Sequence, residues 1–362
     1  MEKMSSSKAA MQDATGSLVT VKDMLDVGCA QKKADWQDPT GTIGEIMSRR
    51  RVSCTPEQFH HAVNVAFHEF ESEVYDQGHR DMWESLPQQI ELLIEDYLQS
   101  CSDAPAEIHV LDIGCGTGLA SSCLLQTGVN KRIKSIDLLD TSPSMLRRAA
   151  SRAAEWGVTT ACHEGLLYSL AGEKRFELIV ASSVLHHVPD LAAFLHLLPR
   201  LQAANGIFLH IQDPNGDYLD DPQLRQRMTR KVRLPEWARR LSPWRIGRRI
   251  YRELTGRKGD TYIWKTNRAL IEKGIISEPL TVQEIFAIVD IHAADGKGIS
   301  LSQMQLWMPE YDCVSKRSYG FFGELWSKLP PARKTTEQSL IASRAPNGFY
   351  VGAIWKLRSA GS

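Results

Sequence analysis

The sequence lacks several features that mark whole classes of protein. Its 362 residues carry 43 Lys and Arg against 43 Asp and Glu, so neither sign of charge is in surplus. No stretch approaches the ~20 apolar residues that a membrane-spanning helix needs, and the N-terminal residues contain no apolar segment typical of a secretory signal. With 43% hydrophobic and 24% charged residues, the composition is globular rather than disordered. We therefore expect a cytoplasmic protein, and not one that binds nucleic acid with its whole surface.

The cysteines do not occur in the spacings that are typical of disulfide frameworks or structural zinc sites. The seven cysteines are odd in number, and no two have C-x-x-C spacing. This argues against a disulfide framework and against a structural zinc site. The sequence thus predicts no metal and a core held by apolar packing alone, which a chain of this length can supply.

What is present is a change of pattern along the chain. Residues 1–54 read as a tail with a weak helical extension. A capping box with proline at the first helical position, Thr55-Pro56-Glu57-Gln58, opens helices over 55–100. From Ile108 onward, short apolar runs alternate with helical segments, which predicts a mostly parallel, doubly wound sheet. The expected strands are 108–113, 133–140, a third ending at 162–165, 176–182, 206–213, 299–307 and 348–357.

The decisive segment is a glycine-rich turn after the first of these strands. Three glycines at alternate positions, Gly114, Gly116 and Gly118, follow Asp112 at the strand end. Glycines permit a tight strand-to-helix turn and close approach of a ligand to the backbone. Dinucleotide folds use G-x-G-x-x-G to seat a pyrophosphate. The G-x-G-x-G spacing suits a nucleoside without phosphates, and the acid can pair with a cationic amine.

This segment resembles the first motif of the class I S-adenosylmethionine-dependent methyltransferases that act on small molecules. Asp140 heads a Asp-x-Ser-Pro-x-Met-Leu segment similar to the family's ribose-binding motif, and 176–190 (FELIVASSVLHHVPD) resembles its fourth strand and following loop. The resemblance implies a Rossmann-like α/β fold with a seven-stranded, mostly parallel sheet whose last strand is antiparallel. It also implies S-adenosyl-L-methionine as cofactor. The cofactor residues it implies are Asp112, Gly114, Gly116, Gly118, Asp140, Thr141, Met145, Leu166, Leu167 and Ser182.

Two of these assignments have competitors. Asp137 competes with Asp140 for the ribose, although Asp140 has the strand-end position. Many family members carry an acid that accepts from the adenine amino group, whereas the alignment places Leu166 there. Adenine is then held by packing on Leu166, Leu167 and Met145, or else Glu164 takes this part and the register shifts by two.

Candidate catalytic residues follow the strands that border the expected crevice. His186 or His187 is a candidate general base or orients the acceptor, and the sequence does not distinguish them. Asp213 closes the fifth strand and is suited to an amine acceptor or a cation. By analogy with relatives that carry a Tyr-Asp element, Tyr75, His79 and Trp83 are expected to wall the active site. For each of them, ordinary helix packing is the alternative.

The zero net charge conceals an uneven distribution. Residues 222–273 contain 16 Lys and Arg against 4 Asp and Glu, so the rest of the chain is acidic. The surrounding insertion, 214–280, separates the core segments 55–213 and 281–362. It reads as a helical lid over the substrate, as a site for an anionic or carrier-bound acceptor, or as a peripheral membrane contact. Nucleic-acid binding lacks supporting motifs.

The expected function is methyl transfer from S-adenosylmethionine to a small-molecule acceptor at an N, O, S or C atom. Such in-line displacement depends mainly on positioning and desolvation. The alternatives are a peripheral-membrane lipid or quinone methyltransferase and a regulatory protein that binds the cofactor without catalysis. The acceptor and the oligomeric state are not specified by the sequence.

Overall fold

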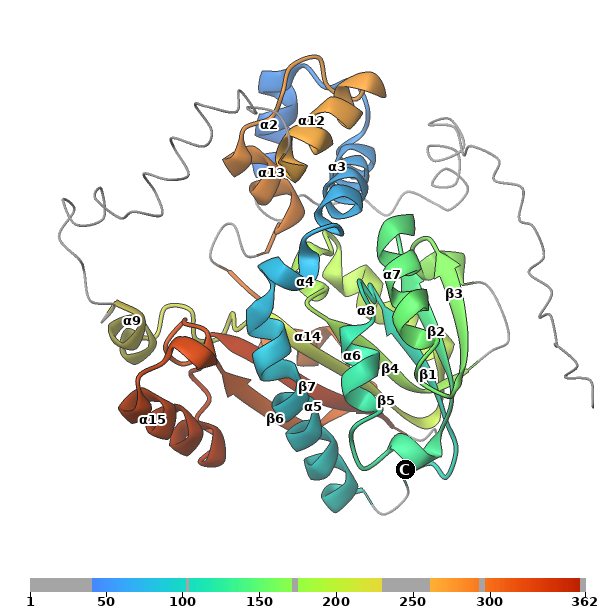
Figure 1. Ribbon diagram of the computed structural model, residues 1–362, viewed down its shortest axis with the longest axis vertical. Helices are drawn as coiled ribbons and strands as arrows, with labels where there is room; N and C mark the ends of the chain where they lie inside the picture. The colour runs from blue at the N-terminus through green and yellow to red at the C-terminus, as the bar shows by residue number, and fades with distance from the viewer. Residues whose placement is uncertain (1–40, 102–103, 171–174, 230–260, 293–296, 359–362) are drawn as a thin grey trace, which may run out of the picture. The chain divides into compact units, whose positions relative to one another are not determined.

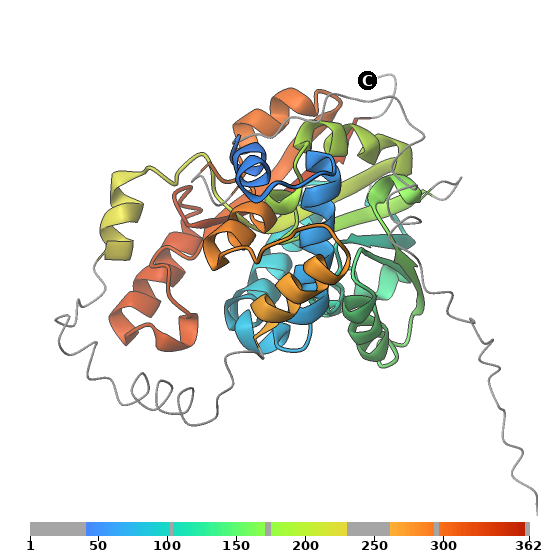
Figure 2. The same ribbon diagram turned by 90° about the horizontal axis from the view of Figure 1, so that it is seen from above.

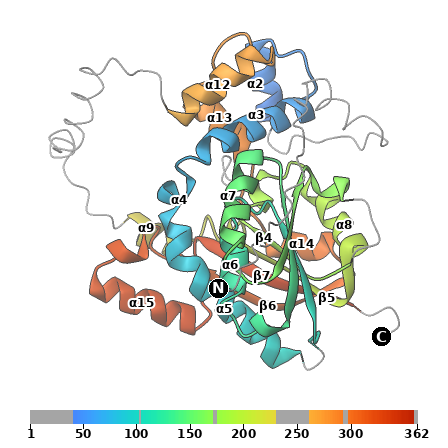
Figure 3. The ribbon, with the colours of Figure 1, turned by 45° about the vertical axis from the view of Figure 1, so that its right-hand side comes forward.

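A seven-stranded sheet organises the computed structural model, which describes residues 41–101, 104–170, 175–229, 261–292 and 297–358. These all lie within the unit Trp36–Ser362. The strands run in the order β3-β2-β1-β4-β5-β7-β6 (Figures 1 and 3). Their bounds are β1 Ile108–Ile113, β2 Ile133–Asp140, β3 Thr159–Glu164, β4 Phe176–Ser182, β5 Gln202–Pro214, β6 Tyr311–Tyr319 and β7 Tyr350–Leu357.

Strand directions agree with the fold expected from the sequence. The pairs β1–β2, β1–β4, β2–β3 and β4–β5 are parallel. The last strand, β7, is antiparallel to both β5 and β6. The order reverses between β1 and β4, and in such sheets ligands bind at this switch point, outside the carboxyl ends of the strands.

Two helical layers cover the sheet because the central strands are apolar on both faces. Consecutive residues of β1, such as Val110 and Leu111, alternate between the two faces and belong to different buried clusters. One face packs on α5 (Arg80–Ser100), α6 (Leu119–Leu124), α7 (Pro143–Ala153) and α15 (Pro331–Ala342), the other on α8 (Leu191–Leu201) and α14 (Leu301–Trp307). No helix within the described ranges is both long and apolar enough to cross a membrane.

A third buried cluster lies in four further helices, which we call the cap. It joins α2 (Thr42–Arg50), α3 (Pro56–Glu71), α12 (Tyr262–Glu272) and α13 (Val282–Val289), and Figure 2 shows α3 and α12 side by side. An ion pair from Arg50 to Glu284 (2.7 Å) ties α2 to α13. The cap therefore combines parts of the N-terminal extension, the insertion and the segment after it.

The remaining elements are short. Of the basic segment 222–273, α9 (Pro222–Thr229) and α12 are described, and 230–260 lie outside the described residues. The other short helices are α4 (Tyr75–Gly78), η1 (Asn130–Arg132), η2 (Leu167–Ser169), η3 (Leu185–His187) and η4 (Trp326–Lys328).

One expected strand is wrong. Residues 299–307 were expected to be extended, but Leu301–Trp307 forms α14, and the strand follows at Tyr311–Tyr319. The side chain of Ser300 accepts from the backbone NH of Gln303 (3.0 Å), and Asp217 accepts from Leu301 NH (3.0 Å). These caps satisfy backbone donors at the first turn and favour a helix over the alternating pattern.

Candidate active site

The glycine turn forms the floor of a crevice at the carboxyl ends of β1, β2 and β4. Gly114, Gly116 and Gly118 all have positive φ angles (59°, 53° and 80°), a region that favours glycine. A Cβ on Gly114 would lie 2.6 Å from a methyl of Val184, whereas one on Gly116 would meet no atom within 4 Å. Gly114 therefore permits close packing, and Gly116 presents bare backbone to the crevice.

Asp140 joins the end of β2 to this turn. Its carboxylate accepts from the backbone NH of Gly116 (2.8 Å) and of Ser142 (2.8 Å). Burial raises the pKa of Asp140 above its usual range, although these backbone hydrogen bonds oppose the shift. Asp137 instead contacts His163 (2.7 Å). Of the two acids, Asp140 is the one that lines the crevice.

A first cavity of about 350 Å³ opens above the turn. Its size is in the range of small-ligand pockets. Apolar side chains from α7, α8 and the segment after β3 form one side, and Leu166 is among them whereas Glu164 is not. The expected cofactor residues that line it are Gly114, Gly116, Asp140, Thr141, Met145, Leu166, Leu167 and Ser182.

Helix α3 of the cap closes the first cavity from the opposite side. His60, His61, Asn64 and His68 all line it; His60, Asn64 and His68 recur every four residues and so share one helix face. Glu69 fixes this helix to the start of α7. Its carboxylate accepts from the hydroxyl of Ser142 (2.8 Å) and the backbone NH of Ser144 (3.0 Å).

A second cavity of about 200 Å³ adjoins the first. Four residues line both cavities: His68, Tyr75, Ser183 and His187. Ser183 has a positive φ of 60°, a strained conformation for a residue other than glycine and one that recurs at functional sites. The second cavity is lined by the aromatic residues Phe67, Phe286, Phe349 and Tyr350, and by polar residues that include imidazoles and carboxylates.

His186, one of these polar residues, is paired with Asp213, which lines neither cavity. The fully buried Asp213 carboxylate accepts from Nδ1 of His186 (2.8 Å). Burial alone would raise the pKa of Asp213, but the hydrogen bond from His186 and the nearby ring of His210, whose Nδ1 lies 3.6 Å from Asp213 Oδ2, outweigh it and lower the pKa. A bulge in β5 at Gln212, with φ 69°, accompanies this placement, as bulges often do beside active sites.

A second carboxylate orients two more imidazoles. Glu71 on α3 accepts from Nδ1 of His68 (3.2 Å) and from Nε2 of His79 (3.2 Å). Burial acts to raise the pKa of Glu71, but these hydrogen bonds and the charges of both rings lower it to about 2. With Nδ1 of His68 held by Glu71, its Nε2 is left to face the cavities.

His187 and Tyr75 complete the shared wall. Nδ1 of His187 contacts the carbonyl oxygen of Val289 (2.7 Å), and burial lowers the pKa of the ring well below its usual value. Burial and nearby carboxylates raise the pKa of Tyr75. At neutral pH, His187 is therefore uncharged and Tyr75 keeps its proton.

Some expected site residues lie outside both cavities. Trp83 is 40% exposed, and the guanidinium of Arg152 stacks over its ring at 4.9 Å. Asp112 is fully buried beneath the turn, where it accepts from Ser121 Oγ (2.6 Å). A Cβ on Gly118 would lie 3.2 Å from the ring of Trp156, and Gly118 is not part of either lining.

Several lining residues escaped the sequence interpretation. The polar stripe of α3 was visible as a four-residue spacing. Asp290 carried no such signal, because its place beside His186 and His187 depends on the cap helix α13, about 100 residues further along the chain.

Part of the chain is similar to known proteins. Residues 111–208 match a family model described as a methyltransferase domain. A ubiquinone biosynthesis O-methyltransferase of Methylobacterium sp. is 33% identical over 104 residues, 28% of this chain and 40% of that protein. A protein of the same description from Alkalilimnicola ehrlichii is 32% identical over 113 residues, 31% of this chain and 44% of that protein. The chain therefore spans less than half the length of these curated relatives.

Two solved methyltransferase structures are similar to the chain at low sequence identity. An S-adenosylmethionine-dependent methyltransferase from Clostridium acetobutylicum is 18% identical, with a TM-score of 0.32 over 42% of this chain and 59% of its own. A plantazolicin methyltransferase in complex with a substrate analogue and S-adenosylhomocysteine is 10% identical, with a TM-score of 0.45 over 84% and 98%. On its family match, the chain carries a segment, residues 111–208, that is similar to a methyltransferase domain.

Proposed function

We propose that this protein transfers the methyl group of S-adenosylmethionine to a hydroxyl oxygen of a small aromatic acceptor. The observation that carries the proposal is the pair of adjoining cavities at the carboxyl edge of a methyltransferase domain. The first has the size and glycine floor for a nucleoside, and the second holds a compact acceptor. A shared wall is what in-line transfer between two bound molecules requires.

In the first cavity, the positions of the lining side chains support the following cofactor contacts. Asp140 accepts from the ribose hydroxyls, and Thr141 and Ser182 line the same rim. Leu166, Leu167 and Met145 pack on adenine, because Glu164 is exposed and does not face the cavity. Asp112 lines neither cavity, and its Oδ1 is buried beneath the turn without a hydrogen-bond partner in the described part of the chain, so we assign it no contact in this cavity.

The second cavity favours an aromatic hydroxyl over an aliphatic amine. Phe67, Phe286 and Phe349 offer ring surfaces, on which an aromatic acceptor packs. The names of the curated relatives, which are O-methyltransferases of ubiquinone biosynthesis, support an oxygen acceptor. His79 lies in this cavity, and its pKa is raised because Glu71 outweighs the effect of burial.

In the reaction, the acceptor oxygen forms a bond to the methyl carbon while the bond from that carbon to the sulfonium sulfur breaks. The neutral leaving group is S-adenosylhomocysteine, and the hydroxyl proton must go to a base. We assign this part to Nε2 of His68, which lines both cavities and is oriented by Glu71. Tyr75 and His187 form the shared wall, and His186, held by Asp213, orients the acceptor.

Two variants test the cofactor site. Gly116→Arg fills the open space above the turn with a cationic chain, and Asp140→Ala removes the proposed ribose acceptor. Calorimetric titration with S-adenosylhomocysteine is expected to show at least a tenfold loss of affinity in both, with unchanged circular dichroism. Glu95→Ala on the exposed side of α5 is the control. Wild-type affinity in both variants contradicts the assignment.

The reaction itself is tested by release of S-adenosylhomocysteine against a panel of phenols, catechols, amines, thiols and carboxylic acids. Turnover of a phenol or catechol that falls at least a hundredfold in His68→Gln agrees with the proposal. Cofactor binding with no turnover of any member of the panel favours a regulatory protein instead. Turnover confined to amines overturns the choice of acceptor.

A further inference from the structure

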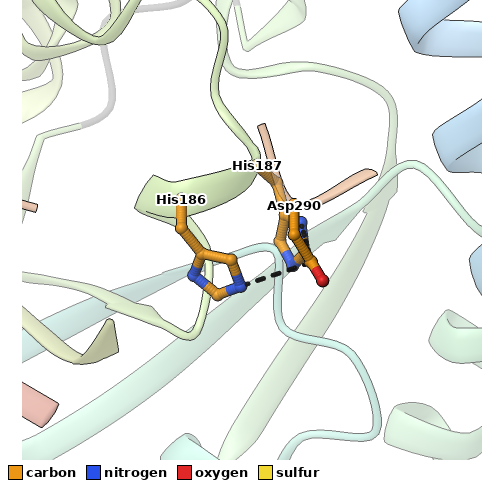
Figure 4. Close-up of side chains that lie close together, drawn as sticks. All are labelled: His186, His187 and Asp290. Carbon is orange, nitrogen blue, oxygen red and sulfur yellow. Dashed lines mark ion pairs between the residues drawn. The ribbon is translucent and has the colours of Figure 1, made fainter. Parts of the chain in front are cut away.

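A cluster of nitrogen and oxygen donors lines the second cavity, and the proposed base His68 is not one of its members. One ring nitrogen of His186, one of His187 and a carboxylate oxygen of Asp290 all lie within 4.8 Å of one another. Asp290 Oδ1 is 3.3 Å from Nδ1 of His187 and 3.7 Å from Nε2 of His186. Figure 4 shows both imidazoles directed at this one carboxylate.

These separations suit a shared metal ion. Donors that bind one ion at about 2.1 Å each are separated by roughly 3 to 3.5 Å in tetrahedral or octahedral geometry. The separation of His186 Nε2 from Asp290 Oδ1 (3.7 Å) is slightly above that range. The contact of His187 to Asp290 is through Nδ1, which is hydrogen-bonded to Val289, so the His187 ring has to turn to complete the site. Two of the three residues lie in η3, and the third, Asp290, is the C-cap residue of α13.

One hydrogen bond behind the cluster is of the kind that ligand histidines need. Nδ1 of His186 donates to the buried carboxylate of Asp213 (2.8 Å), so Nε2 is the nitrogen that faces Asp290. In His187 the nitrogen nearest Asp290 is Nδ1, which also donates to the carbonyl of Val289 (2.7 Å), so this ring binds an ion only after it turns. Carboxylates and carbonyls behind a histidine fix its tautomer and orientation in metal sites.

We propose that His186, His187 and Asp290 bind a divalent transition-metal ion in the second cavity. Two imidazoles and one carboxylate favour Zn²⁺, Mn²⁺ or Fe²⁺ over Mg²⁺ and Ca²⁺, which prefer oxygen donors. All three residues line the cavity, so the remaining coordination positions face the acceptor. The ion would bind the acceptor oxygen and polarise it next to the methyl donor. This use rests on the proposed function, whereas the binding site does not.

The test is metal binding to the full chain after removal of bound metal with a chelator. Titration calorimetry with Zn²⁺ and with Mn²⁺ is expected to give one site per chain for at least one of the two ions. Asp290→Asn and His187→Gln, which keep side-chain size, are expected to weaken that site at least tenfold. His196→Gln on the exposed side of α8 and Asp220→Asn in an exposed turn are matched controls.

Co²⁺ gives a second readout, because its visible absorption reports nitrogen coordination without any turnover. Absence of stoichiometric binding in the wild type overturns the proposal, as does equal binding in Asp290→Asn and the controls. S-adenosylhomocysteine affinity, measured on the same samples, separates the two ideas. A protein that binds metal but no cofactor contradicts the proposed function alone, and one that binds cofactor but no metal contradicts this inference alone.

Discussion

Asp112 is a buried carboxyl group, one of whose oxygens has no hydrogen-bond partner in the described part of the chain. It is fully buried, and burial raises its pKa to about 7 although hydrogen bonds from Ser121 act to lower it. A carboxyl whose pKa is higher in the folded state than in the unfolded state binds its proton more tightly when folded. Its contribution to stability is therefore lost as the pH rises from about 4 to about 7.

Asp112→Asn is accordingly expected to stabilise the cofactor-free protein at pH 8 and to have little effect near pH 4. The shift in pKa corresponds to at most about 4 kcal/mol, less the cost of an amide nitrogen with no acceptor. Thermal unfolding at the two pH values measures this. An equal gain in stability at both pH values contradicts the argument.

Glu71 gives a second pH dependence of opposite sign. Because its pKa falls to about 2, its stabilising effect is present above about pH 4.5 and is lost as the pH falls through 2. The raised pKa of His79 contributes stability below pH 6.5, which is lost as the pH rises through the higher folded value. The two effects overlap between about pH 4.5 and 6.5.

Glu71→Gln should therefore have its largest loss of thermal stability in that interval. Unfolding midpoints measured from pH 3 to 9 are expected to show the deficit narrowing on both sides. Glu73→Gln is the control, because Glu73 forms an exposed ion pair with Lys265, and such pairs contribute little. A deficit that does not vary with pH would mean that Glu71 acts through packing alone.

At the scale of elements, the contact between α3 and α7 links the cap to the ribose side of the first cavity. Glu69 brings the negative charge that the start of α7 favours and accepts from Ser142 and Ser144. Glu69→Ala should release this end of α3 and weaken S-adenosylhomocysteine binding about tenfold, because charge-assisted hydrogen bonds are worth about 1.5–3 kcal/mol. Hydrogen exchange should quicken in α3 and not in β1. Unchanged affinity together with unchanged exchange counts against the link.

Elements whose signals are local could be predicted from the sequence. Thr55 accepts the backbone hydrogen bond expected of a helix cap, and Ser142 and Thr281 cap α7 and α13 in the same way. The strand 133–140 has the expected bounds, because it is a short apolar run that ends in an acid. Helix α14 was missed because its first turn depends on Asp217, a residue far from it in sequence.

Site residues, too, could be predicted where the signal is local and were missed where it depends on distant segments. The glycine turn and Asp140 stand at the crevice because strand ends place them there, which a motif can indicate. The cap was not predicted, since its core joins segments more than 200 residues apart, as the pair Arg50–Glu284 illustrates. Asp290 was missed for the same reason, and so was His68 as a residue of both cavities.

At the scale of the whole molecule, the cap has a buried core separate from the two that flank the sheet. Clusters that share few contacts can open independently, with local free energies below that of global unfolding. Because α3 walls the first cavity, an open cap lacks the α3 side of the proposed cofactor site. Ligand affinity then scales with the fraction of molecules whose cap is closed.

Ile285→Ala tests this coupling, because Ile285 is fully buried in the cap and lines neither cavity. Loss of that side chain should cost roughly 2–5 kcal/mol, and the cost should appear first as faster hydrogen exchange in α2, α3, α12 and α13. S-adenosylhomocysteine affinity should fall with it, while exchange in β1 and β4 stays slow. Ile179→Ala, in the sheet core, should instead raise exchange throughout. If both variants raise exchange everywhere alike, the cap and the sheet unfold as one unit, and cofactor binding draws on global stability alone.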